Sequence, residues 1–141
     1  MGRERGKRPL LVGDIGGTNA RFGIQKERSK RIEQIEVFPC AEFPSLSDAI
    51  EVYLSHHCPE RPEAASIAVA TPVTGDFIRM TNHVWSFSVE ECRRSVGLEQ
   101  LLVLNDFTAL AMALPELGPG DFHQVGRGSA EEGRAIALLG P

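Results

Sequence analysis

Hydrophobic and polar positions at the start of this chain alternate with the short period of β-strands. Leu10-Leu11-Val12 is an apolar run, and Arg21-Phe22-Gly23-Ile24 alternates polar with apolar residues, as a half-buried strand does. Ile32, Ile35, Val37 and Phe38 indicate a third strand, which Pro39 ends. These runs predict an antiparallel meander at the beginning of the fold.

After the meander, the pattern changes to alternating helices and strands. In chain order we expect a helix capped by Ser45, a strand over 64–70, a helix from the capping box at Ser88 to Gly97, a strand over 101–104, a helix over 108–114 packed behind that strand, and a strand over 135–139. The strand over 101–104 is apolar throughout, which is typical of a strand buried on both faces. The pattern predicts the α/β class: a mixed sheet with an opening antiparallel meander and helices on its faces.

The turn between the first two strands carries the first candidate chemistry. It reads Gly13-Asp14-Ile15-Gly16-Gly17-Thr18-Asn19, and its glycines tolerate positive φ and let backbone N–H groups approach phosphate oxygens. Thr18 and Asn19 add side-chain donors. Asp14 would repel a phosphate unless a cation lay between them, so it predicts Mg²⁺ held through water. The spacing matches neither a Walker loop nor the dinucleotide fingerprint, and a tight hairpin with a purely structural Gly-Gly stays open as the alternative.

A second candidate site follows the strand over 101–104. Asn105 and Asp106 come at its carboxyl end, where open α/β sheets bind ligands. A carboxylate there can accept a proton from a substrate hydroxyl, and the neighbouring amide can orient that hydroxyl. The alternative is that these residues only cap the following helix.

Together these segments resemble the bacterial glucokinase family of the actin-like ATPase superfamily. The strings that carry the resemblance are Val12-Gly13-Asp14-Ile15-Gly16-Gly17-Thr18-Asn19-Ala20-Arg21, Thr81-Asn82-His83-Val84-Trp85-Ser86-Phe87-Ser88 and Leu104-Asn105-Asp106-Phe107-Thr108-Ala109. The resemblance runs from about Leu10 to Pro141. It implies a ribonuclease H-like lobe and ATP-dependent phosphorylation of glucose at the 6-hydroxyl, in which Asp106 is the catalytic base and Asn105 and Asp106 bind the sugar.

The resemblance also implies the cofactors and the domain organisation. In the family, the segment that matches Gly13, Asp14, Ile15, Gly16, Gly17 and Thr18 contacts the phosphates of ATP. We expect Asn19 to join this contact through its side-chain donor, and Asp14 to hold Mg²⁺, for the chemical reasons given above. We expect a disordered basic leader over 1–9 and the amino-terminal small lobe of a glucokinase over 10–141, truncated where the family's second phosphate loop begins. The partners would be glucose, ATP and a missing carboxyl-terminal lobe, so we expect the fragment alone to be inactive and to form a homo-oligomer. A kinase for another hexose and a non-catalytic nucleotide or sugar sensor stay open.

Composition adds few constraints. A net charge of −4 gives no nucleic-acid footprint, and no apolar run reaches membrane-spanning length. The three cysteines, widely spaced, fit reduced thiols, so we expect a cytoplasmic protein.

His56-His57-Cys58 suggests a metal, but the sequence shows no second ligand cluster, and solvated imidazoles at a helix end are the better interpretation. His83 is expected to be a structural hydrogen bonder and Trp85 to be in the core.

Overall fold

The computed structural model describes residues 9–26, 29 and 31–140. The basic leader expected over 1–9 lies outside these residues, apart from Pro9. The described residues contain a five-stranded mixed sheet, a two-stranded hairpin and three α-helices. None of the helices in this part of the chain is long and apolar enough to cross a membrane.

The elements follow the order that the hydrophobic pattern predicts. They are β1 (Leu10–Ile15), β2 (Asn19–Gln25), β3 (Ile32–Pro39), α1 (Leu46–His57), β4 (Ala64–Val69), β5 (Phe77–Arg79), β6 (Ser86–Ser88), α2 (Val89–Val96), β7 (Gln100–Asn105) and α3 (Asp106–Ala113), with short 3₁₀ turns at Cys40–Glu42, Leu114–Glu116 and Pro119–Asp121. The two-stranded hairpin of β5 and β6 was not predicted, because three-residue strands are too short to show a period.

The sheet confirms the predicted fold class. Its strand order is β3-β2-β1-β4-β7. The first three strands pair antiparallel as a meander, whereas β4 and β7 join β1 in parallel. The sheet is therefore mixed, and its parallel half is reached through crossovers that contain α1 and α2.

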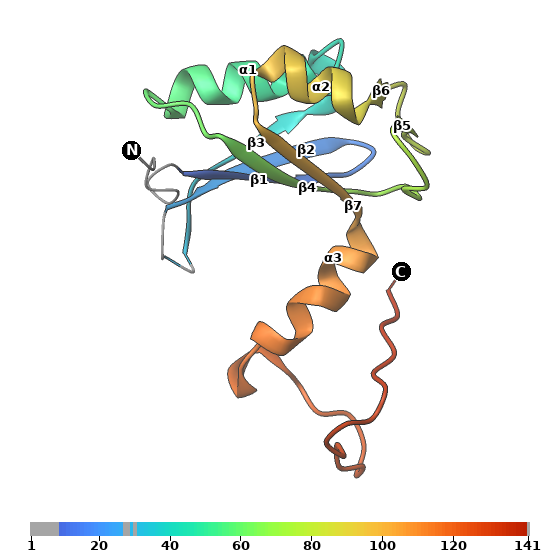
Figure 1. Ribbon diagram of the computed structural model, residues 1–141. Helices are drawn as coiled ribbons and strands as arrows, with labels where there is room; N and C mark the ends of the chain where they lie inside the picture. Colours follow the sequence, from blue (N-terminus) through green and yellow to red (C-terminus); the bar gives the residue numbers. More distant parts are fainter. Residues whose placement is uncertain (1–8, 27–28, 30, 141) are drawn as a thin grey trace.

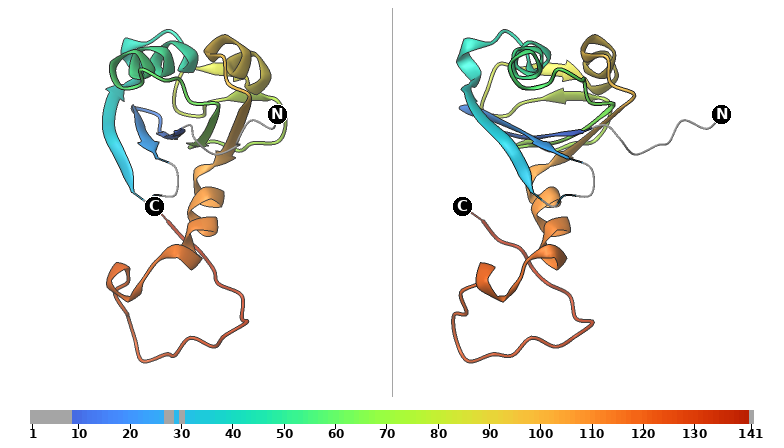
Figure 2. Two further views of the ribbon diagram at one scale, coloured as in Figure 1. Left: turned by 60° about the vertical axis from the view of Figure 1, so that its left-hand side comes forward. Right: turned by 90° about the vertical axis from the view of Figure 1, so that its left-hand side faces the viewer.

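The core lies between the sheet and one layer of helices. Figures 1 and 2 show α1 and α2 side by side over the same face of the sheet. Tyr53 and Leu54 of α1 pack there against inward-facing side chains such as Phe22 and Ile67, and all four are at most 1% exposed. Burial of an apolar side chain of this size contributes about 1.5–3 kcal/mol to the free energy of folding. The packing of α1 on the sheet therefore stabilises the sheet on which the candidate site is built.

The caps that the sequence predicts at Ser45, Ser88 and Gly97 form, whereas α3 begins at Asp106, before the predicted start at Thr108. The hydroxyl of Ser45 accepts a hydrogen bond from the Asp48 backbone N–H, and the hydroxyl of Ser88 accepts one from the Glu91 N–H. Gly97 ends α2 with φ 76°, a left-handed conformation that a side chain would oppose.

Three expectations for the carboxyl-terminal part were wrong. β7 is not buried on both faces: Val103 is 7% exposed, but Leu102, on the opposite face, is 51% exposed. α3 does not pack behind β7 but projects away from the sheet (Figure 1), and none of its residues is buried. Residues 135–139 form no strand, because no other described strand lies beside them to complete a hydrogen-bonded ladder.

Candidate active site

The strand register brings three chain segments to one edge of the sheet. Ile15 of β1 pairs with Val69 of β4, which pairs in turn with Asn105 of β7. The three parallel strands therefore end at the same level, with their carboxyl ends adjacent. Ligands bind at this edge in open α/β sheets.

A cleft of about 310 Å³ lies at this edge. Its lining residues are Asp14 of β1, Ala68 of β4, and Asp106, Phe107 and Leu110 of α3. Asp14 and Ala68 face away from α1 and α2, since the alternate residues Ile15 and Val69 are buried in the core. The structure thus brings the two predicted carboxylates, Asp14 and Asp106, to one cavity on the face of the sheet opposite α1 and α2.

Asn105 caps α3, as the alternative interpretation of the sequence proposed. Its Oδ1 accepts hydrogen bonds from the backbone N–H groups of Phe107 and Thr108, at 3.1 and 3.3 Å. Its Nδ2 donates to the carbonyl of Thr71 and to Oδ1 of Asp106, both at 3.1 Å. Capping does not exclude a role in the site, because the same side chain fixes the Asp106 carboxylate.

Thr71 supports this arrangement, and sequence reasoning missed it. It is 4% exposed, and its hydroxyl bonds to the Arg79 carbonyl and to the Thr81 hydroxyl, at 3.0 and 2.8 Å. Its carbonyl in turn accepts the bond from Asn105. The sequence signal that could have identified Thr71 is its position directly after the strand predicted over 64–70. That position does not by itself indicate the contact with Asn105.

Asp14 is the more exposed carboxylate of the cleft. Its side chain is 61% exposed, and one oxygen lies 3.9 Å from Nη1 of Arg21 on the paired position of β2. An exposed ion pair at this distance contributes little to stability. The Asp14 carboxylate is therefore available to a solvated cation.

The glycine-rich turn does not use positive φ. The described residues with positive φ are Gln34, Gly97, Gly126 and Gly133, so the tolerance of Gly16 and Gly17 for that conformation is not used. Gly17 is needed for a different reason: a Cβ on it would lie 2.7 Å from the Cβ of Asn82.

Hydrogen bonds hold the same turn from inside. The Gly16 N–H donates to the Asn19 carbonyl at 2.9 Å, and the Cys40 N–H donates to the Thr18 carbonyl at 2.8 Å. Ile15 is 1% exposed, so only its backbone faces the turn, and its carbonyl accepts from the Ala70 N–H. The Thr18 and Asn19 side chains are exposed. The turn is thus pre-formed and directs its polar side chains outward.

His83 and Trp85 have the structural roles that the sequence predicts. Nδ1 of His83 accepts a hydrogen bond of 3.2 Å from the Trp85 backbone N–H, and the two rings pack edge to face. Trp85 is 3% exposed and donates its indole N–H to the Phe43 carbonyl. Neither residue lines the cleft.

Comparison with known proteins identifies closely similar sequences. The sequence model of the Glucokinase family matches residues 11–141. "Bifunctional protein glk" of Burkholderia pseudomallei (strain 1710b) is 51% identical over 94% of this chain, and "Glucokinase" of Helicobacter acinonychis (strain Sheeba) is 50% identical over 94% of it. The chain spans 21% of the first protein and 40% of the second.

A solved structure agrees with these matches. The crystal structure of a glucokinase from an Antarctic psychrotroph superposes with a TM-score of 0.79, at 39% sequence identity. The match covers 89% of this chain and 40% of that one. In each of these three proteins, more than half of the length has no counterpart in this chain.

Proposed function

Because the chain belongs to the glucokinase family, we propose that it is the amino-terminal lobe of an enzyme that transfers the terminal phosphoryl group of ATP to the 6-hydroxyl of glucose. The observation that carries the proposal is the shared cleft of Asp14 and Asp106. One carboxylate suits a proton acceptor, the other a cation, and phosphoryl transfer to an alcohol requires both functions.

We assign Asp106 as the general base. Within the described residues, the hydrogen bonds to its carboxylate come from Asn105 Nδ2 and the Phe107 N–H, and both reach Oδ1. These bonds fix the orientation of the carboxyl group, and Oδ2 is then the oxygen that takes the proton of the sugar hydroxyl. Positioned bases of this kind accelerate reactions by about 10²–10⁴-fold.

Asn105 is proposed to orient the same hydroxyl. It stands at the end of β7, and its amide already directs a hydrogen bond toward Asp106. Because Thr71 holds that amide from the other side, the Asn105 and Asp106 side chains form one rigid unit. A rigid unit keeps the sugar hydroxyl in line with the phosphate, which is the main requirement of this reaction.

The residues of the β1–β2 turn fit ATP and Mg²⁺. Mg²⁺ keeps several waters and binds to proteins through one or two carboxylates together with substrate phosphates, and the exposed carboxylate of Asp14 fits that mode. We propose that the turn from Gly13 to Asn19 contacts the phosphates through backbone N–H groups and the Thr18 and Asn19 side chains. The cation, when bound, neutralises the charge of the transferring phosphoryl group.

The rest of the enzyme is proposed to lie in a carboxyl-terminal lobe, since the chain spans 40% of the Helicobacter glucokinase. That lobe would complete the adenosine and sugar sites and exclude water, which competes with glucose as acceptor. We further propose a cytoplasmic, glycolytic enzyme that assembles as a homo-oligomer and binds neither nucleic acid nor membrane.

A phosphorylation assay tests this proposal. Glucose 6-phosphate formation from ATP is measured for the 141-residue chain and for the chain extended by the carboxyl-terminal lobe of the Helicobacter relative. We expect turnover only from the extended protein, with glucose preferred over mannose and fructose. Robust turnover by the 141-residue chain would contradict the two-lobe proposal, and an extended protein that binds glucose without phosphorylating it would favour the sensor alternative.

A further inference from the structure

Three potential metal ligands meet at the carboxyl-terminal end of α1, on the helix-covered face of the sheet. His56 and His57 come from the last turn of α1, and Glu36 comes from β3. Nε2 of His57 lies 2.6 Å from Oε2 of Glu36, and Nδ1 of His56 lies 3.7 Å from the same oxygen. The ligand atoms of the three residues all lie within 4.8 Å of one another. The histidine pair expected to be merely solvated thus has a carboxylate partner that only the tertiary structure reveals.

The surrounding structure holds this cluster in place. The pairing of β2 with β3 is irregular beside Gln34, which has φ 53°, a strained value for a residue with a side chain. The Tyr53 hydroxyl donates a 2.8 Å hydrogen bond to the Gln34 carbonyl and so ties the irregular part of β3 to α1. The Tyr53 ring also packs on the His57 ring, with centroids 4.7 Å apart. Glu36 and His57 therefore approach each other from two elements that are fixed to one another.

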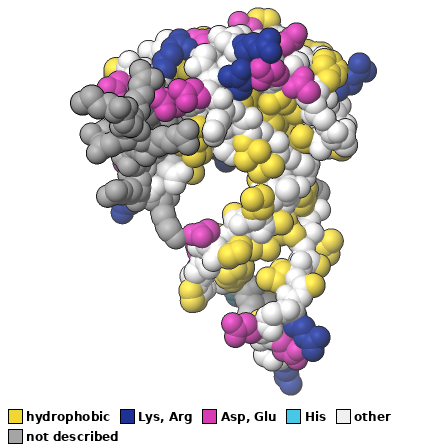
Figure 3. Space-filling view, viewed as in Figure 1, with side chains coloured by type: hydrophobic (Ala, Val, Ile, Leu, Met, Phe, Trp, Pro, Cys, Tyr) yellow, Lys and Arg dark blue, Asp and Glu magenta, His cyan; other side chains and the backbone are white. Residues whose placement is uncertain are grey.

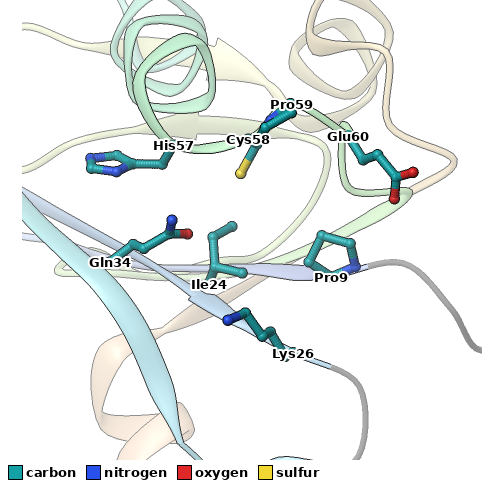
Figure 4. Close-up of a pocket in the computed structure, with 8 residues that line it drawn as sticks. All are labelled: Pro9, Ile24, Lys26, Gln34, His57, Cys58, Pro59 and Glu60. Atoms are coloured by element: carbon teal, nitrogen blue, oxygen red, sulfur yellow. The ribbon is translucent and has the colours of Figure 1, made fainter.

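The His57 ring has room to adjust. A cavity of about 480 Å³, lined in part by Lys26, Gln34, His57 and Cys58, lies beneath the end of α1. Figure 4 shows the His57 ring above Gln34, while the Cys58 thiol points down toward Ile24. The side chains of His57, Glu36 and His56 are 27%, 33% and 54% exposed, so the cluster is open to solvent.

We propose that Glu36, His56 and His57 form a binding site for a divalent transition-metal cation of the zinc type, with the fourth position open to water. Ligand atoms around tetrahedral Zn²⁺ lie about 3.3 Å apart, given metal–ligand bonds of about 2.0–2.1 Å. The 3.7 Å separation is already close to that value, and the 2.6 Å pair opens by less than one ångström as the cation displaces the proton between the two side chains. Two imidazoles and one carboxylate are a ligand set that Zn²⁺ uses and that Mg²⁺ does not favour.

Titration of metal-free protein tests the site. After treatment with a chelator and its removal, ZnCl₂ is added to the 141-residue chain in a calorimeter, and MgCl₂ is added in a parallel experiment. We expect one Zn²⁺ per chain and no heat of binding from Mg²⁺. Loss of even an outer-shell partner costs about 10–100-fold in metal affinity, so Glu36→Gln, His56→Gln and His57→Gln should each weaken binding by at least about 10-fold.

Two matched variants make this test specific. His123→Gln removes an exposed histidine of the carboxyl-terminal segment, and Cys58→Ser removes the thiol next to the cluster; both should retain Zn²⁺ binding. Visible absorption of the Co²⁺-loaded protein provides a second readout, which should show tetrahedral ligand-field bands that disappear in His57→Gln.

The proposal is overturned if the wild type does not bind Zn²⁺, if His57→Gln binds as tightly as His123→Gln, or if only Cys58→Ser loses binding. Circular dichroism of each variant establishes that it is folded before it is titrated. The Zn²⁺ site and the cleft of Asp14 and Asp106 lie on opposite faces of the sheet, so this result is independent of the phosphorylation assay.

Discussion

Gly17 and Asn82 are in such close contact that no side chain fits between them. A Cβ on Gly17 would lie 2.7 Å from the Cβ of Asn82 and 3.0 Å from its carbonyl oxygen. The turn between β1 and β2 therefore rests directly on the loop that leads to Trp85. Contact with Asn82 thus excludes a side chain at Gly17, a glycine that the sequence suggests for phosphate approach.

Gly17→Ala should destabilise the chain by about 1–3 kcal/mol, the usual cost of overpacking, because the backbone of Asn82 has to move. Gly75→Ala is the matched control: a Cβ there meets nothing within 4 Å, and its φ is not positive. Urea unfolding curves measure both. Equal midpoints for the two variants would show that the Asn82 loop yields without cost.

Asp106→Asn should lower kcat of the two-lobed enzyme at least ~100-fold while leaving glucose affinity nearly unchanged. The amide oxygen of Asn can keep the hydrogen bonds that Asp106 Oδ1 accepts, so the shape of the site is retained and the base is lost. Steady-state kinetics checks the first effect and equilibrium glucose binding the second. Asp121→Asn, remote from the cleft in the 3₁₀ turn Pro119–Asp121, should behave as wild type. Unchanged turnover in Asp106→Asn would refute the assignment of the base.

Asp14→Ala should raise the Mg²⁺ concentration needed for half-maximal turnover and reduce kcat more than it weakens glucose binding. Folding stability should change by less than about 1 kcal/mol, since the pair with Arg21 is exposed and 3.9 Å long. A Mg²⁺ titration at saturating ATP and glucose measures the effect. If the titration curve coincides with that of wild type, Asp14 has only a structural role.

Acid stability should depend on Glu90. Hydrogen bonds from Arg93 and then Arg94 lower the pKa of the Glu90 carboxyl from 4.5 to about 2. Because this pKa is lower in the folded state, the Glu90 carboxylate stabilises the folded protein at pH values above its ordinary pKa of 4.5. The stabilisation is lost as the pH falls toward 2. Wild type should therefore exceed Glu90→Gln in Tm at pH 6 and converge with it near pH 2.

The size of the Glu90 effect should fall with added salt, because the ion pairs are at the surface. Glu131→Gln is the control, since its pair with Arg134 joins side chains that are 69% and 77% exposed. Thermal melts at several pH values and two salt concentrations measure the differences. A pH-independent gap between wild type and Glu90→Gln would contradict the titration argument.

The 141-residue chain should associate as its concentration rises. Hydrophobic side chains gather along α3 (Figure 3), where Leu110 is 47% and Met112 65% exposed, and Leu102 on the edge strand β7 is 51% exposed. Exposed apolar surface beside an open strand edge favours self-association. Light scattering over a concentration series should show oligomers that Leu102→Thr weakens and Leu139→Thr does not. A monomer at every concentration would contradict this expectation.

The sequence predicted the local parts of the fold because local residues determine them. Ser45, Ser88 and Gly97 act within one turn of their own helices, and the alternation over 21–24 needs only a sheet face to pack against. The positions of Asp14 and Asp106 near strand ends followed in the same way. That both residues line one cleft depends on the parallel order β1-β4-β7, which the sequence did not predict.

What the sequence missed depends on partners far along the chain. Glu36 meets His57 only because α1 packs on β3, and Thr71 reaches Asn105 only because β4 pairs with β7. The apolar residues of α3 could not show that this helix projects away from the sheet. A helix rich in Leu, Ala and Met has the same sequence pattern whether it packs in the core or is exposed. The direction in which a helix leaves a sheet, and the partner that a side chain meets, depend on the tertiary structure and are not contained in local sequence patterns.

The register that joins Ile15, Val69 and Asn105 has a consequence for folding kinetics. The β1–β2 turn closes within a few residues, whereas β1 meets β4 only across β2, β3 and α1, and β4 meets β7 only across the β5–β6 hairpin and α2. Contacts between distant segments form slowly, because the chain must first lose the entropy of closing the loop. The β1–β2 turn should therefore form before the pairings of β4 with β1 and with β7, and only those later pairings bring Asp14 and Asp106 to one cleft.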